Sequence, residues 1–482
     1  MEWLFLLYHV VIILAIIHVI LDCRQPAKTV AWTLMIYFVP VAGLLAYLLV
    51  GVNIRRERYV SRRSMDQLSR RQMDAFLEQL EQKGPAGTRH EPPLDLPEAQ
   101  DTLINFFARQ DGALPFRSHD VEFYRDGYEF FPSLLHYIAQ ARHHIHIDMY
   151  IVQDDALGLL LGDALIAKAQ EGVEVRLVYD DVGSWKTSER YFERLRMAGI
   201  EVSAFMPVRF PIFARKVNYR NHRKIIVIDG QTAFIGGMNF ATRYVKGRTQ
   251  PWRDTMMRVS GPAAYSLQRA FFIDWYFVDR TLITHKRYYP SFHLKGPQPP
   301  ILTQTVMHSP NAQQPMIQMG LMRIIMSART YVYIQSPYFL PTEPVLTALK
   351  YAAGGGVDVR LMVPLHSDAP FTDWSSRAYL RQAAEAGVQV ELYRSGFLHS
   401  KLLVADDEVC TVGSTNMDFR SLENNFEANT FIYNKVVARR LRNLFLQDER
   451  HAVLLARIRR RMKPSIWVRL LESVTRIIAP LL

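Results

Sequence analysis

The chain has 482 residues, of which 49% are hydrophobic and 12% aromatic, and its formal net charge is +12. This length exceeds that of one ordinary domain and fits two domains with appendages. The positive charge favours an anionic partner, either nucleic acid or acidic lipid. Only two cysteines occur, which excludes a disulfide framework and a cysteine zinc site.

The N-terminal segment is predicted to form a transmembrane hairpin. Residues 3–21 and 29–52 contain no formally charged side chain, and each stretch is long enough to cross a hydrocarbon core, which takes about 20 residues. Glu2 stands where a signal peptide would carry basic residues, so two spans are favoured over a cleaved signal. Pro40 and Gly43 leave a re-entrant hairpin open for the second stretch.

The cations around these apolar stretches predict their orientation. The short connection between them has Arg24 and Lys28, whereas a denser arginine cluster follows the second stretch. The cluster consists of Arg55, Arg56, Arg58, Arg62 and Arg63. Because positive residues stay on the cytoplasmic side of a membrane, the N-terminus and the bulk of the chain are expected in the cytoplasm.

The composition also marks linkers and a C-terminal helix. Residues 84–97 and 294–300 are rich in glycine and proline, which is typical of linkers. A basic cluster at residues 457–463 is followed, from Ser465, by apolar residues at helical i, i+3, i+4 spacing. This pattern predicts an amphipathic helix in the headgroup layer of a membrane, and packing on the protein core is the alternative.

Two stretches of the chain share the pattern H-x-K-x4-D. The pattern residues are His222, Lys224, Asp229, His399, Lys401 and Asp406. Aliphatic residues follow each lysine, so each motif is predicted to begin a buried strand, with its histidine and lysine on one face about 6–7 Å apart. Imidazole is a nucleophile near neutral pH, and an ammonium group neutralises phosphate. The pattern predicts one active site, built from two halves, that attacks phosphate with histidine.

The two aspartates of the motifs are interpreted first as structural residues. Each lies seven residues from its histidine and falls in a dipeptide typical of hairpin turns, Asp229-Gly230 or Asp406-Asp407. A chemical role is the second interpretation.

Small residues and an asparagine follow each motif after a second apolar strand. They are Gly237 and Asn239 in the first copy, and Ser414 and Asn416 in the second. Glycine and serine permit close approach to the backbone, and an asparagine amide donates to phosphate oxygens. These four residues are therefore predicted to bind phosphate.

An acid follows each histidine at a similar distance. Asp254 comes 32 residues after His222, and Glu427 comes 28 residues after His399. A carboxylate bonded to the far imidazole nitrogen fixes the tautomer and raises the nucleophilicity of the ring. We therefore interpret both acids as supporting residues.

Further similarities extend the duplication. Residues 172–177 resemble 356–361, and residues 198–202 resemble 386–390. Two copies predict a pair of similar α/β domains, each with a mixed sheet covered by helices, and an active site between them. The cluster His143-His144-x-His146 alternates with isoleucines, as in a half-buried strand, and lacks acids to complete a metal site. His146 or Asp148 is kept as a candidate for the mouth of the pocket.

The paired motifs with their tails resemble those of the phospholipase D superfamily, over about residues 100–450. With its N-terminal apolar segments, the chain looks like the bacterial cardiolipin synthases of that superfamily. The resemblance implies an α/β fold of two tandem phospholipase D-like domains. The expected divisions are a transmembrane hairpin at 1–54, a charged helix and linker at 55–99, the first domain at 100–293, a linker at 294–300, the second domain at 301–455 and a basic amphipathic helix at 456–482.

The resemblance also implies the chemistry. It implies a metal-independent and cofactor-independent phosphatidyl transfer between two phosphatidylglycerol molecules, through a phosphohistidine, giving cardiolipin and glycerol. By resemblance, His222 is the attacking histidine. The expected location is a bacterial inner membrane, with the catalytic part facing the cytoplasm. The expected partners are an anionic phospholipid membrane and phosphatidylglycerol, not nucleic acid, and an oligomer is left open.

Three alternatives are kept. A membrane-bound phospholipase D would hydrolyse or transphosphatidylate other phospholipids with the same residues. A nuclease of the superfamily would fit the basic charge but has no need of membrane segments. A non-catalytic scaffold would have no reason to keep both His/Lys pairs with their tails.

Overall fold

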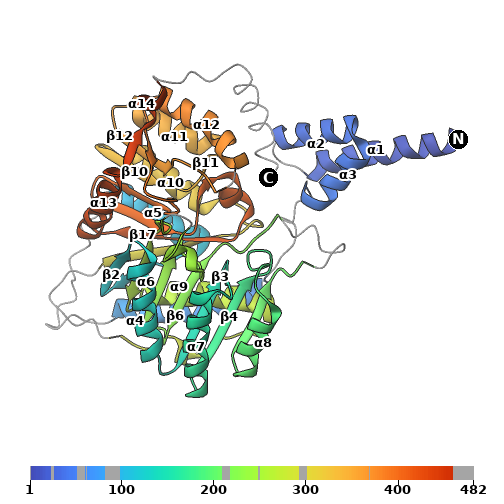
Figure 1. Ribbon diagram of the computed structural model, residues 1–482. Helices are drawn as coiled ribbons and strands as arrows, with labels where there is room; N and C mark the ends of the chain where they lie inside the picture. The colour runs from blue at the N-terminus through green and yellow to red at the C-terminus, as the bar shows by residue number, and fades with distance from the viewer. Residues whose placement is uncertain are drawn as a thin grey trace.

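The computed structural model describes residues 2–22, 26–51, 60, 62–81, 98–208, 218–247, 250–292, 301–368 and 370–459. Two α/β halves lie one above the other, and a group of N-terminal helices projects to one side (Figure 1). The predicted linkers at 84–97 and 294–300, and the predicted amphipathic helix from Ser465, lie outside the described residues.

The first half is built on a seven-stranded mixed sheet with the order β2-β8-β7-β6-β3-β4-β5. The pairs β3–β4 and β4–β5 are parallel, and the other pairs are antiparallel. The elements of this half are β2 (Asp120–Tyr124), α6 (Gly127–Gln140), β3 (His144–Met149), α7 (Ala156–Gln170), β4 (Glu174–Asp180), α8 (Glu189–Met197), β5 (Glu201–Phe205), β6 (Lys224–Ile228), β7 (Thr232–Gly236), η4 (Thr242–Tyr244), β8 (Met256–Ser260), α9 (Ala264–Asp279) and η5 (Lys286–Tyr288).

The second half is built on a nine-stranded sheet with the order β1-β9-β17-β15-β14-β10-β12-β13-β18. Between its two outer strands, this order repeats that of the first sheet, so the predicted duplication is confirmed. The elements are β9 (Ile301–His308), α10 (Met316–Ser327), β10 (Tyr331–Gln335), β11 (Phe339–Leu340), α11 (Glu343–Gly354), β12 (Asp358–Pro364), α12 (Pro370–Glu385), β13 (Gln389–Tyr393), β14 (Leu402–Ala405), β15 (Val409–Gly413), β16 (Met417–Asp418), η6 (Arg420–Asn424), β17 (Glu427–Tyr433), α13 (Lys435–Glu449), β18 (Ala452–Leu454) and α14 (Leu455–Arg459).

The second half also takes up a segment that precedes the first half in the chain. Strand β1 (Phe116–Ser118) pairs with β9, and helix α5 (Glu98–Asp111) packs against α10 and β9. Helix α4 (Arg62–Glu81) packs instead on α9 of the first half. The chain therefore contributes to the second half before it begins the first sheet. The expected start of the first domain at residue 100 stays a prediction.

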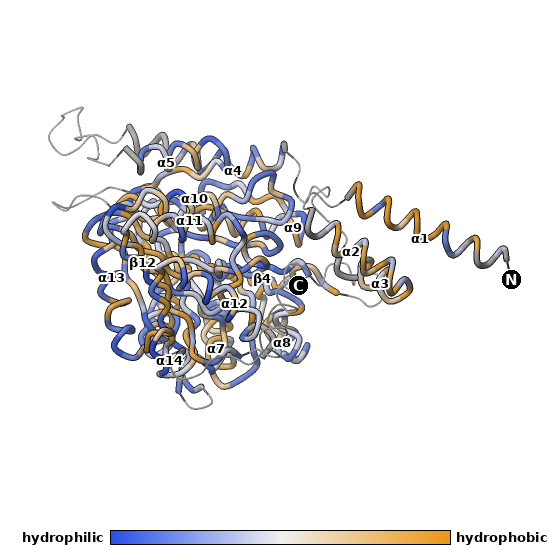
Figure 2. Tube along the Cα trace, turned by 90° about the horizontal axis from the view of Figure 1, so that it is seen from above, coloured by the Kyte–Doolittle hydropathy of each residue, from blue (hydrophilic) through white to orange (hydrophobic). Residues whose placement is uncertain are grey.

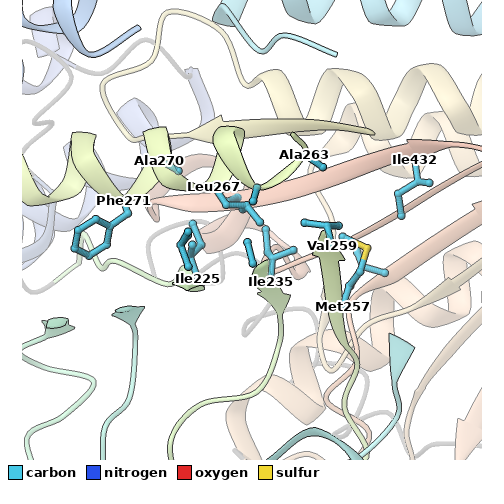
Figure 3. Packing of buried hydrophobic residues seen from close by; sticks show 14 of the residues in the cluster. Ile225, Ile235, Met257, Val259, Ala263, Leu267, Ala270, Phe271 and Ile432 are labelled. Carbon is cyan, nitrogen blue, oxygen red and sulfur yellow. The ribbon is translucent and has the colours of Figure 1, made fainter. Parts of the chain in front are cut away.

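One hydrophobic cluster is shared by the two halves. Ile225, Ile235 and Val259 of the first sheet pack beneath Leu267 of α9, and Ile432 of β17 lies beside them (Figure 3). Each of these side chains is at most 1% exposed. Burial of one such side chain stabilises the fold by about 1.5–3 kcal/mol. Because both sheets contribute to this cluster, the halves are packed as one body.

The N-terminal segment forms three helices and a single π-helical turn. These are α1 (Glu2–Asp22), α2 (Pro26–Phe38), α3 (Pro40–Ala46) and η1 (Tyr47–Gly51). Pro40 disfavours a helical Val39, and the second apolar stretch is divided at this point. Figure 2 shows that α1 is mostly hydrophobic where it leaves the body, and large apolar side chains along it are exposed, Trp3 by 82%.

Judged by length and apolar content, no helix in the described part of the chain qualifies to cross a bilayer. The predicted two-span hairpin is therefore not confirmed.

Arg223, a buried residue within the first motif, joins the two halves. The Arg223 guanidinium bonds both carboxylate oxygens of Asp274 in α9, at 2.6 and 2.5 Å. It also donates to the carbonyl oxygens of His308 (2.9 Å) and Glu427 (3.1 Å), both in the second sheet. Arg223 is only 1% exposed, so these hydrogen bonds take the place of the bonds that its guanidinium would make to water.

We expect Arg223→Met to lower the free energy of unfolding by about 3–5 kcal/mol, because it leaves Asp274 buried without its cation. Denaturant or thermal unfolding measures the loss. The matched control is Arg194→Met, which removes an exposed ion pair with Asp163 and should cost less than about 1 kcal/mol. Equal losses in the two variants would contradict the assigned role of Arg223.

Candidate active site

His222 is held against an acid of the other half. A β-bridge joins residues 221 and 426, and here the His222 N–H donates to the carbonyl oxygen of Phe426 (2.9 Å). The next residue, Glu427, places its carboxylate oxygens 3.0 and 3.2 Å from Nδ1 of His222. Nδ1 also lies 3.1 Å from the carbonyl oxygen of Ser414. Since all these neighbours are acceptors, Nδ1 carries the proton and Nε2 keeps its lone pair.

His399 is held in the same way by an acid of the first half. Its N–H donates to the carbonyl oxygen of Arg253 (2.7 Å), in a bridge between residues 253 and 398. The next residue, Asp254, places Oδ2 at 2.6 Å from Nδ1 of His399. The sequence spacing associates each acid with the histidine that precedes it, but the structure exchanges these partners between the halves.

Both motif lysines are buried beside their histidines. Nζ of Lys401 lies 2.9 Å from Nδ1 of His399 and 3.9 Å from Asp254. Nζ of Lys224 donates to the carbonyl oxygen of His222 (2.5 Å) and lies 4.9 Å from the ring centre of Tyr150. Burial, opposed by the acids, lowers the pKa of Lys224 to about 7 and the pKa of Lys401 to about 8.

The histidines are neutral and the acids charged at neutral pH. Burial lowers the pKa of His222 to about 4 and that of His399 to about 3, although the paired acids oppose this effect. Burial alone would raise the pKa of Asp254 and of Glu427, but the neighbouring lysine and histidine bring both below the usual values. Two neutral imidazoles are thus supported by two carboxylates, and the Nε2 atom of His222 is available to a ligand.

The histidines line one cavity between the halves, of about 370 Å³. Its lining residues are Tyr150, Ile151, His222, Asn239, Arg243, Trp252, Tyr338, Leu340, Asp368, His399, Asn416, Asp418, Phe419, Arg420, Ser421 and Asn425. Its size is that of a small-molecule site. Of the four residues predicted to bind phosphate, Asn239 and Asn416 line this cavity.

The other two residues predicted to bind phosphate pack against the supporting acids. A Cβ atom on Gly237 would lie 2.1 Å from Oδ1 of Asp254, so the glycine makes room for the carboxylate. The Ser414 hydroxyl bonds the carboxylate of Glu427 and accepts from the N–H of Ala428 (3.1 Å). Both residues therefore position an acid, which the sequence pattern did not indicate.

The motif aspartates lie at the far ends of their strands, outside the cavity lining. The Asp229 carboxylate accepts three backbone N–H groups, of residues 142–144, at 2.8–2.9 Å. Asp406 does the same for residues 329–331 at 2.7–2.8 Å. Both have left-handed backbones, with φ of 54° and 53°. This geometry agrees with the structural interpretation of the two residues and gives neither a contact with the cavity.

The histidine cluster of β3 faces away from the cavity. His144 and His146 bond the Gln268 side chain of α9, at 2.9 and 2.8 Å, and His146 stacks on Phe271 with ring centres 4.5 Å apart. Burial lowers the pKa of His144 to about 2, so it stays neutral. Asp148 is buried and also absent from the cavity lining. The expectation that His146 or Asp148 lines the mouth of the pocket is therefore wrong.

Comparison with known proteins gives the family. The family described as cardiolipin synthase, phospholipase D-like domain, matches residues 134–275 and 321–449, one segment in each half. A cardiolipin synthase of Geobacillus thermodenitrificans is 37% identical over 466 residues, which cover 96% of this chain and 90% of that protein. One of Oceanobacillus iheyensis is 36% identical over 475 residues, which cover 98% and 97%. The chain belongs to the cardiolipin synthase family of the phospholipase D superfamily.

Two further similarities concern the N-terminus and the fold. Residues 10–51 match the phospholipase D-nuclease N-terminal family. The crystal structure of a phosphatidylserine synthase from Haemophilus influenzae aligns with 80% of this chain and 99% of its own, with a TM-score of 0.63 at 15% identity. At this identity, the similarity establishes a shared α/β fold.

The aspartate geometry generates a prediction. Asp229→Asn and Asp406→Asn keep a residue that tolerates the left-handed backbone but weaken the bonds to three N–H groups. We expect each variant to lose about 1–3 kcal/mol of stability and to keep phosphatidyl transfer within about threefold. Unfolding and initial rates measure the two effects. A fall in rate by orders of magnitude at unchanged stability would show a chemical role instead.

Proposed function

We propose that this phosphatidyltransferase is a cardiolipin synthase, which transfers a phosphatidyl group from one phosphatidylglycerol to a second and releases glycerol. The observation that carries the proposal is the crossed pairing of two histidines with two acids at one cavity. Two imidazoles beside two buried ammonium groups suit a double displacement at a phosphodiester. Its family membership supports the same reaction.

In the first half-reaction, Nε2 of His222 attacks phosphorus. A P–N bond forms and the bond from phosphorus to the glycerol oxygen breaks, while Nε2–H of His399 gives its proton to that oxygen. The surrounding protein keeps His399 neutral, but a phosphodiester anion placed between the imidazoles favours its charged form. The choice of His222 as the nucleophile rests on the resemblance to the superfamily.

In the second half-reaction, the incoming lipid takes the place of glycerol. A hydroxyl of the second phosphatidylglycerol gives its proton to Nε2 of His399, and its oxygen attacks phosphorus. The P–N bond breaks, and cardiolipin and free His222 result. Asp254 stabilises the imidazolium of His399, Glu427 orients His222, and the two lysines neutralise the developing charge. Asn239 and Asn416 serve as donors to the phosphate oxygens.

The proposal places the protein at a bacterial inner membrane. The exposed apolar side chains of α1–α3 suit an apolar surrounding, and we propose that residues 1–54 form the membrane hairpin. The arginine cluster after it supports a cytoplasmic location of the halves, proposed at 100–293 and 301–455. The basic region at 456–482 would bind anionic headgroups. Close contact with the bilayer brings lipid hydroxyls, not water, to the phosphohistidine.

The decisive experiment uses purified protein and labelled phosphatidylglycerol in vesicles. We expect cardiolipin and glycerol as products, and we expect His222→Ala and His399→Ala each to lower the rate at least about 10³-fold. His136→Ala, on the exposed face of α6, is the control. Near-normal turnover by either site variant would overturn the two-half site. Phosphatidic acid as the main product would favour a hydrolytic phospholipase D.

The lowered lysine pKa values predict an alkaline limit. His399 must gain a proton for the reaction, so kcat/KM should fall with rising pH above the pKa values of the histidines. Lys224 must be protonated to neutralise phosphate, so this fall should become steeper above about pH 7–8. The acid limit should lie near the pKa of His222, about 4, below which the nucleophile is protonated. Lys224→Arg keeps its charge and should move the alkaline limit up by about one pH unit or more.

The matched control for this prediction is Lys435→Arg, which alters an exposed cation on α13. The pH profile of kcat/KM should be unchanged in this variant. An alkaline limit that stays in place in Lys224→Arg would mean that another group sets it.

A further inference from the structure

Each half contributes an arginine to the cavity at the same place in its repeat. Arg243 follows Asn239 by four residues, and Arg420 follows Asn416 by four residues. Both arginines line the cavity, one in η4 and the other at the start of η6. This repeated asparagine–arginine spacing is visible in the sequence, and the motif analysis did not use it.

Arg243 lies on the side of His399. Its guanidinium carbon is 4.9 Å from the ring centre of Trp252, and that ring is 5.1 Å from the ring of His399. Within the described residues, its guanidinium makes no hydrogen bond or ion pair to another side chain. A cation held by an aromatic ring, and not neutralised by a carboxylate, is available to an anionic ligand.

Arg420 lies on the side of His222. The carbonyl oxygen of Arg420 accepts from the N–H of Asn425 (2.8 Å), and the Asn425 amide donates to Glu427, the acid that holds His222 (3.3 Å). The two arginines therefore mark the two sides of the cavity, one beside each histidine.

The direction of the displacement gives these two sides different ligands. If Nε2 of His222 attacks phosphorus in line, the leaving and entering oxygens lie on the other face of the phosphorus atom, on the side of His399. The entering hydroxyl belongs to a lipid whose own phosphate is only one glycerol away. That second phosphate must lie on the His399 side, while the phosphate under attack occupies the centre between the lysines.

The same side also carries groups for hydroxyl donors. The Asp368 carboxylate accepts a hydrogen bond from the hydroxyl of Tyr338 (2.8 Å). The Tyr338 ring is 6.4 Å from the ring of Phe397, which is 5.9 Å from the ring of His399. The other carboxylate among the lining residues, Asp418, accepts instead from the Asn416 amide (3.2 Å) and from the N–H of Ser421 (2.7 Å). A surface with one guanidinium and one carboxylate suits a ligand that offers a phosphate anion and alcohol groups.

We propose that Arg243 forms the acceptor subsite, where its guanidinium binds the phosphate of the second phosphatidylglycerol. Arg420, its counterpart, serves the donor side. This inference rests on the proposed function, and it names the residue that distinguishes a phospholipid acceptor from a small alcohol. Glycerol itself brings no second phosphate, so its return to the phosphohistidine does not need Arg243.

Two reactions of one enzyme preparation test the inference. Cardiolipin formation uses the lipid acceptor, and exchange of labelled glycerol into phosphatidylglycerol uses glycerol as acceptor. We expect Arg243→Gln to lower the ratio of cardiolipin formation to glycerol exchange by about tenfold or more. Arg420→Gln should lower both reactions alike and leave the ratio unchanged. Lys246→Gln, an exposed cation outside the cavity lining, should leave both rates unchanged.

The outcomes separate this inference from the proposed function. A wild-type protein that performs neither reaction would overturn the proposed function itself. A wild-type protein that performs both, with an unchanged ratio in Arg243→Gln, would overturn the inference alone. Selective loss of cardiolipin formation in Arg420→Gln would also overturn it, because the acceptor would then enter beside His222. If Arg243→Gln folds poorly, Arg243→Lys carries the test, with a smaller fall in the ratio expected.

Discussion

Each histidine of this protein takes its orienting acid from the opposite half, next to a backbone bridge that crosses the interface. In both bridges, the histidine N–H donates to the residue immediately before the acid, at 2.9 Å for His222 and 2.7 Å for His399. Bridge and acid are neighbours in sequence, so separation of the halves would remove both at once. The shared hydrophobic cluster and the buried Arg223 hold the two halves in the relative position that both bridges need. The site therefore exists only when the halves are assembled.

The second constraint is electrostatic. Two lysines, two histidines and two carboxylates are withdrawn from water around a cavity of about 370 Å³. Burial penalises every charge, so the acids stay ionised only because cations adjoin them, and the lysines titrate near neutral pH. A bound phosphodiester adds negative charge and shifts this balance towards the protonated lysines and an imidazolium. The buried charges of the site therefore favour an anionic ligand.

The sequence predicts those features that depend on neighbours along the chain. Strands β6 and β14 begin at or next to the motif lysines, and Asp229 takes the turn conformation expected from its dipeptide. The duplication predicts two equivalent sheets, which the strand order confirms. Spacing carries no information on which half supplies an acid, and the exchange of partners was therefore missed. The same applies to Gly237, whose missing side chain accommodates a carboxylate from a different strand.

The pairing of β1 with β9 has a consequence for biosynthesis. Phe116 of β1 lies opposite Thr303 of β9, so the ribosome adds 187 residues after Phe116 before this pair is complete. At about 5–20 residues per second, that takes roughly 10–40 s. In the last part of this interval, after β8 has been made, the first sheet has all its strands, but β1 still has no partner strand, and such an edge can pair with other chains. The β1 strand thus waits longer for its partner than any strand of the first sheet, whose most distant pair is β2 with β8.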